Sequence, residues 1–109
     1  MLLPVVAAAQ RESLPRLPSK AFKFEGLTVR ANGENQFRPV MRGVTHTGFP
    51  IEVHETDLAA GGQPHPAHKH LAEEMFLLRE GSLDVTVNGE TTRLSAGSTI
   101  RVRIGPSIL

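Results

Sequence analysis

Residues 82–87 and 100–104 alternate apolar and polar side chains with a period of two, the pattern of a strand that has one buried face. The apolar positions are Leu83, Val85 and Val87, and later Ile100, Val102 and Ile104. Asn88-Gly89 directly follows the first set. This dipeptide favours a two-residue type I′ hairpin, in which both central residues take a positive φ. No helical periodicity rivals this pattern, and short strands joined by Gly-rich turns predict an all-β sandwich or barrel.

Other strands are expected on the N-terminal side of this region, at residues 21–24, 27–30, 37–47, 51–58 and 75–78. The polar stretch 31–36 is expected to form a loop. Pro39 lacks a backbone N–H, so its strand is expected to lie at a sheet edge or to start late. Residues 75–78 are apolar on both faces, which predicts a strand buried between layers or under a subunit contact.

The composition limits the chain to one small domain with nearly balanced charge. Its 109 residues include 12 Lys and Arg against 11 Asp and Glu, so no strong field is present to hold a nucleic acid or an anionic membrane surface. No apolar run approaches the ~20 residues of a membrane span. Cysteine is absent, which leaves metal binding to His, Asp and Glu. We expect a soluble protein with no nucleic-acid or membrane partner.

Residues 1–20 are expected to form an extended or disordered arm in front of a β-domain at 21–109. Pro15 and Pro18 interrupt any helix in this arm. The apolar start ends in three alanines at 7–9, which resembles the end of an export signal. The sequence therefore does not determine the compartment, which is either the cytoplasm or, if translation starts further upstream, an exported location.

Two histidines and a carboxylate have the spacing that a small strand-built metal site requires. His68 and His70 are two residues apart, so on a strand both side chains project from one face, about 7 Å apart. Glu74 follows after a short turn, and an antiparallel neighbouring strand would aim its carboxylate at the same point. Two His and one carboxylate suit iron, manganese, nickel, copper or zinc. Gly62 and Gly81 would provide a tight loop before the first strand and a positive φ after the second.

Three further histidines are possible contributors to this metal site, and the alternative is that no metal binds here. His68 and His70 could instead be surface histidines on a polar strand. His65 lies between two prolines in the loop before them, where it could support the site from outside or be an ordinary loop residue. His54, on the preceding strand, is the first candidate for a replacement ligand, ahead of His46.

The strand that starts at Glu74 contributes the remaining candidates. Glu73 competes for the carboxylate role but would point to the opposite face, where solvent is expected. Phe76 and Leu78 share the phase of Glu74 and would line the cavity if Glu74 points inward, although core packing alone explains them. Arg101 alternates with apolar neighbours and is expected to face water.

The residues Gly62, His68, His70, Glu74 and Gly81 together fill every position of the first conserved motif of the cupin superfamily. Residues 51–109 therefore resemble a cupin domain. The resemblance implies a small jelly-roll β-barrel that holds a metal inside, bound by His68, His70 and Glu74.

The second cupin motif departs from the pattern. When it is started at Gly97, Arg103 stands in place of the expected Pro, Gly105 fits, and Ile108 stands where the last ligand His belongs. The sequence also ends before the strands that usually close such a barrel. We expect a barrel incomplete at its C-terminus and completed by the N-terminal arm or by a second subunit. Since exposed sheet edges are templates for pairing, we expect a homodimer.

Two classes of function follow from the resemblance. In the first, three protein ligands leave coordination positions open for a small oxygenated molecule, which implies a metal-dependent enzyme of the dioxygenase or isomerase kind. The alternative is a non-catalytic cupin that binds a small ligand or metal, or a truncated gene product that keeps the fold without activity. A fold alone does not choose between them.

Overall fold

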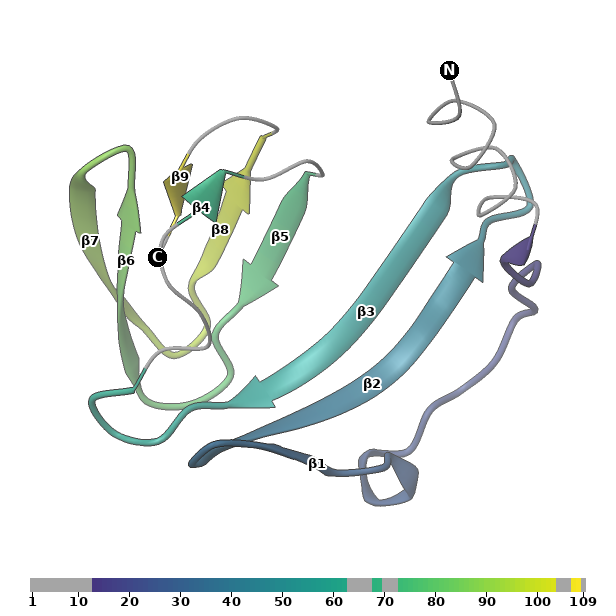
Figure 1. Cartoon of the computed structure of the whole chain (residues 1–109), viewed down its shortest axis with the longest axis horizontal. Helices are drawn as coiled ribbons and strands as arrows, with labels where there is room; N and C mark the ends of the chain where they lie inside the picture. Colours follow the sequence, from purple (N-terminus) through teal and green to yellow (C-terminus); the bar gives the residue numbers. More distant parts are fainter. Residues whose placement is uncertain (1–12, 63–67, 70–72, 104–106, 109) are drawn as a thin grey trace. The chain divides into compact units, whose positions relative to one another are not determined.

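The computed structural model of the protein describes residues 13–62, 68–69, 73–103 and 107–108 (Figure 1). The described residues are predominantly β-strand, which confirms the all-β prediction. The chain divides into two compact units, residues 1–64 and 65–109. No helix among the described residues is long and apolar enough to cross a bilayer.

The first unit contains an antiparallel sheet with the strand order β1-β2-β3. Its strands are β1 (Arg30–Asn32), β2 (Asn35–Val44) and β3 (Pro50–Asp57). The strand predicted at 51–58 is therefore confirmed. The loop predicted at 31–36 is wrong, because β1 and β2 pair directly across a two-residue turn, with Asn32 opposite Asn35.

Two other predictions for the first unit are wrong. The strand expected at 21–24 is replaced by extended chain and a short 3-10 helix, η1 (Phe24–Gly26), because this segment has no pairing partner in the sheet. Pro39 lies in the central strand rather than at an edge. The register between β2 and β3 shifts between Pro39 and Met41, and such a bulge accommodates a residue that cannot donate to the ladder.

The N-terminal arm adds to the sheet of the first unit. The Leu17 N–H donates to the Val44 carbonyl at 2.9 Å, and the Val44 N–H donates to the Pro15 carbonyl at 2.8 Å. Arg16 and Val44 thus form a parallel bridge. Because β3 occupies the other side of β2 along its length, residues 15–17 continue the edge that β1 begins.

The second unit contains two antiparallel sheets. One has the order β4-β9-β6-β7 and the other pairs β5 with β8. The strands are β4 (His68–Lys69), β5 (Glu74–Leu77), β6 (Ser82–Val87), β7 (Glu90–Ser95), β8 (Thr99–Val102) and β9 (Ser107–Ile108). Across the described residues of the chain, the strands form separate sheets and do not close into a barrel.

The core of the second unit lies between its two sheets. Val85 on β6 and Val102 on β8 are buried, with 4% and 2% of their surface exposed. Apolar side chains of the same alternating phase pack around them: Leu83, Val87, Leu94 and Ile100. The period-two pattern therefore predicted the buried face of both strands.

The turn between β6 and β7 is the hairpin that the sequence predicted. Asn88 and Gly89 both take a positive φ, 51° and 80°, as a type I′ turn requires. On the outer face of this hairpin, Thr86 and Thr91 share a hydroxyl hydrogen bond of 2.7 Å.

The outer face of β5 contradicts one expectation. Met75 and Leu77 are 74% and 65% exposed, whereas the sequence predicted a strand buried on both faces. The reason is that β5 and β8 form a two-stranded sheet with no layer over its outer face among the described residues.

Candidate metal centre

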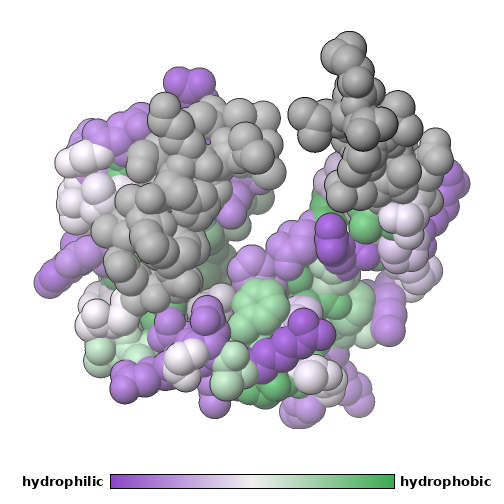
Figure 2. Space-filling view, viewed as in Figure 1, coloured by the Kyte–Doolittle hydropathy of each residue, from purple (hydrophilic) through white to green (hydrophobic). Residues whose placement is uncertain are grey.

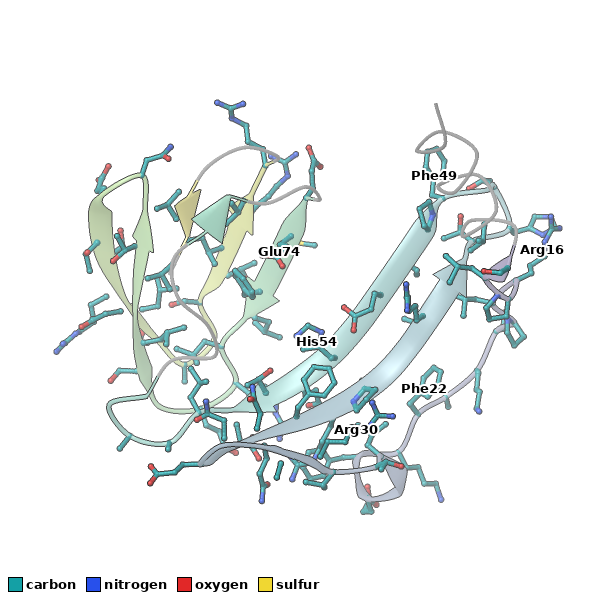
Figure 3. All side chains as sticks on the ribbon, viewed as in Figure 1. Arg16, Phe22, Arg30, Phe49, His54 and Glu74 are labelled. Atoms are coloured by element: carbon teal, nitrogen blue, oxygen red, sulfur yellow. The ribbon has the colours of Figure 1, made fainter. Side chains whose placement is uncertain are left out.

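Glu74 begins β5, and its side chain lies on the inner face of the β5–β8 sheet (Figure 3). Its register partner on β8 is Val102, which is buried in the core. Directly opposed residues of antiparallel strands project to the same face. The atom Oε2 of Glu74 is itself buried. A buried carboxylate oxygen is costly unless it accepts hydrogen bonds or coordinates a cation, so this position suits a ligand that faces the interior.

The neighbouring carboxylate, Glu73, has a different environment. Its Oε2 is 3.1 Å from Nη2 of Arg101, and both side chains are exposed. Arg101 is the register partner of Met75 on the outer face of the same sheet. This agrees with the expectation that Glu73 and Arg101 face water, and it leaves Glu74 as the carboxylate candidate.

Backbone pairing aligns position 68 with positions 108 and 87 across the strands β4, β9 and β6 of the four-stranded sheet. His68 on β4 pairs with Ile108 on β9, and Ile108 also pairs with Val87 on β6. Val87 packs against the core. Positions of one row share a face, so position 68 lies on the sheet face that carries Val87.

The sequence did not predict β9. A two-residue strand is too short to show alternation, and the β-branched Ile108 alone does not predict a strand. Pairing with β4 and β6 is what makes this segment a strand.

The second motif histidine, His70, and the loop histidine His65 lie outside the described residues, and of His68 the structure describes the backbone. Gly81 takes a φ of +80°, as the sequence predicted. Within the part of the chain that the structure describes, no three His, Cys, Asp or Glu side chains come together as a metal site.

Comparison with protein families identifies the family to which these residues belong. The cupin domain family matches residues 54–105, which include β4, β5, the core strands and the whole of the first motif. This segment is a cupin domain. Its membership confirms the family and the small all-β fold that the sequence predicted, and cupin domains commonly bind divalent metals. Comparisons with curated proteins and with solved structures give no match.

His54, the first residue of the cupin match, belongs to β3 of the first unit (Figure 3). Its Nδ1 is 2.9 Å from both carboxylate oxygens of Glu52. Its ring lies 4.7 Å from that of Phe37, centroid to centroid. The sequence did not predict these partners, although Glu52 and His54 are two apart and so share one strand face. His46, the weaker candidate, is exposed in the turn after β2.

Two apolar side chains of the cupin domain were predicted to line a cavity beside Glu74. Phe76 pairs with Ile100 on β8, and Ile100 packs against the core, so Phe76 shares the inner face. Leu78 follows the end of β5, is half-buried, and its N–H donates to the Ser98 carbonyl at 2.9 Å. The inner face of β5 thus carries one carboxylate followed by apolar groups.

The donor set fits a divalent transition metal. Imidazole nitrogen and carboxylate oxygen are ordinary ligands of iron, manganese, nickel, copper and zinc. Glu74 provides a carboxylate with a buried oxygen beside an apolar layer. Among the three motif ligands it is the one whose side chain the structure describes.

Proposed function

We propose that the cupin domain binds one divalent transition metal through His68, His70 and Glu74, and that the bound ion takes a small oxygenated molecule as ligand or substrate. The observation that carries this proposal is the inward placement of Glu74, with Oε2 buried and Val102 as register partner. The row that joins positions 68 and 87 supports it from the opposite sheet.

The chemistry would be that of an open metal site. A bound ion of this kind acts as a Lewis acid that polarises a carbonyl or activates an oxygen ligand. The side chains of His68, His70 and Glu74 would fix its position, and Phe76, which is 37% exposed, and the half-buried Leu78 would give a bound molecule apolar neighbours. A dioxygenase or isomerase reaction suits such a site.

A second candidate is a cupin domain that binds its ligand without catalysis. The observation in its favour is Ile108, which stands where the second motif has a ligand histidine and which pairs with His68 in the sheet. Three protein ligands hold a metal less tightly than four. In this case metal or ligand binding is retained and turnover is absent.

The decisive experiment measures metal bound per chain after purification and reloading with each of the five metals in turn. The wild-type protein is expected to hold one equivalent of at least one metal, and the double variant His68→Ala/His70→Ala is expected to hold less than a tenth of that. Loss of two of three ligands removes most of the coordination energy, so the effect should be nearly complete.

The matched control is His46→Ala, which removes an exposed histidine of the first unit. It should leave the metal content unchanged. His54→Ala tests the replacement ligand, since a loss of affinity would add His54 to the site. Equal, sub-stoichiometric metal in the wild type and in His68→Ala/His70→Ala would contradict the proposal.

We also propose that two copies of the chain associate through the outer face of the β5–β8 sheet. This face carries Met75 and Leu77, both largely exposed, beside the ion pair of Glu73 and Arg101. Apolar groups flanked by charges of both signs can complement a second copy of the same surface, as a two-fold interface requires.

A further inference from the structure

One face of the three-stranded sheet in the first unit contains a groove of about 470 Å³. This volume lies within the range of small-molecule sites. The residues that line it come from all three strands: Arg30, Phe37, Pro39, Val40, Met41, Arg42 and Glu52. Figure 2 shows apolar and strongly polar surface side by side over this sheet.

The register of the strands explains how the groove is arranged. Arg30 on β1 pairs with Phe37 on β2, and Arg42 on β2 pairs with Glu52 on β3. Phe37 and Arg42 are separated by five positions along β2, or about 15 Å of strand. The two arginines therefore mark opposite ends of the groove.

Apolar groups occupy the space between the two ends. Phe37 and Pro39 precede the bulge of β2, and Val40 and Met41 form it. An extra residue at a bulge re-aims the neighbouring side chains. The consecutive residues Pro39, Val40 and Met41 all line the groove.

The guanidinium groups of Arg30 and Arg42 differ from those of the arginines in ion pairs. Arg38, Arg93 and Arg101 each pair with a carboxylate. Within the described residues, Arg30 and Arg42 make no ion pair or side-chain hydrogen bond.

Glu52 lies opposite Arg42 in the ladder, but its two oxygens are held by Nδ1 of His54. The nearest carboxylate is thus engaged elsewhere. Both ends of the groove offer a guanidinium, the side chain best suited to grip a carboxylate with two parallel hydrogen bonds.

We infer that this groove binds a small dicarboxylate with an apolar body, one carboxylate at Arg30 and the other at Arg42, with the body against Phe37 and Pro39. All the lining residues precede residue 54, where the cupin match begins. The groove is thus built from residues of the first unit, whereas the proposed metal ligands belong to the second.

The test is an NMR titration of the full-length chain with terephthalate, an aromatic ring with a carboxylate at each end. EDTA is included so that the ligand cannot act through a bound ion. Benzoate carries one carboxylate on the same ring, and terephthalamide carries none. Terephthalate should bind about tenfold more tightly than benzoate, since a second charge-assisted contact adds roughly that factor, and terephthalamide should not bind measurably.

Arg30→Gln and Arg42→Gln should each weaken terephthalate binding about tenfold, to the level of benzoate. The matched control is Arg103→Gln, which removes an exposed arginine of the second unit and should change the affinity less than twofold. Both groove arginines are exposed, so the amide spectra of the variants should keep the dispersion of the folded protein.

Four results would overturn the inference. Two concern the ligands: absence of saturable binding by terephthalate, and equal affinity for terephthalate and terephthalamide. The other two are saturable shifts that map outside residues 30–57, and an equal loss of affinity in Arg103→Gln and the groove variants. None of these results bears on metal content, so the proposed metal centre is tested separately.

Discussion

Glu73 and Glu74 are adjacent carboxylates with different environments, because successive residues of a strand face opposite sides. Glu73 is in an exposed ion pair with Arg101, whereas Glu74 shares the inner face with Val102. The alternation of side chains along the strand was enough to predict this difference from the sequence. The contact of His54 with Glu52 could not be predicted. The sequence places both side chains on one strand face but does not determine whether they turn toward each other.

Asp84 and Arg93 allow a prediction at the scale of single residues. The hydrogen bonds from Arg93, at 2.8 and 3.0 Å, lower the pKa of Asp84 below its ordinary value of 3.8. A lowered pKa in the folded state contributes stability above the unfolded value, and that stability is lost as the pH falls through the folded value. We expect an NMR titration to show the pKa of Asp84 rising toward 3.8 in Arg93→Gln.

The stability difference between the wild type and Arg93→Gln should be small, since the pair is exposed. It should be present at neutral pH and vanish in acid, below the folded pKa of Asp84. Arg103→Gln serves as the control and should leave the Asp84 titration unchanged. An unchanged titration in Arg93→Gln would show that the hydrogen bond does not cause the shift.

At the scale of elements, local signals predicted those strands whose pairing is also local. The hairpin at Asn88-Gly89 and the alternating strands beside it follow the prediction. The position at which the arm pairs could not be predicted, because the bridge between Arg16 and Val44 joins segments far apart in the sequence. The expectation that Pro39 lies at a sheet edge was also wrong. The bulge that accommodates Pro39 depends on the register between β2 and β3, which the local sequence does not determine.

Gly43→Ala tests the docking of the arm. A Cβ at Gly43 would collide with the Pro15 carbonyl and lie 2.8 Å from the Leu17 side chain, so the arm must move. We expect a loss of about 1–3 kcal/mol in the free energy of unfolding, as for other overpacked sites, measured by urea denaturation. Limited proteolysis should also cut near residues 15–20 faster than in the wild type.

Gly26→Ala is the matched control for this variant. Nothing lies within 4 Å of a Cβ built at Gly26, so the change should be neutral or slightly stabilising. Equal effects of the two substitutions would mean that the contact with the arm is not what constrains Gly43.

At the scale of the whole molecule, the sequence predicted the family and the all-β class, because the first motif and the period-two pattern both lie within the matched residues. It predicted burial of both faces of residues 75–78, and in the described chain the outer face is exposed. A neighbouring copy, as in the proposed dimer, would add the layer that the described part of a single chain does not provide.

Met75→Lys/Leu77→Lys tests the dimer. Two charges at the centre of an apolar contact would be buried without partners, so association should weaken by at least about a hundredfold. Sedimentation equilibrium should show a wild-type dimer at micromolar concentration and a monomeric variant. Val29→Lys, which replaces an exposed apolar residue of the first unit, is the control and should remain dimeric. A wild-type monomer at all concentrations would exclude the interface.

The proposed metal centre holds one ion among His68, His70 and Glu74. Anomalous diffraction from crystals grown with manganese or zinc, recorded at the absorption edge of the metal, tests it most directly. We predict one strong peak in each chain, about 2.0–2.2 Å from an imidazole nitrogen of each histidine and from a carboxylate oxygen of Glu74. A fully loaded crystal whose peak lies elsewhere, or whose three side chains do not meet at any peak, would contradict the account.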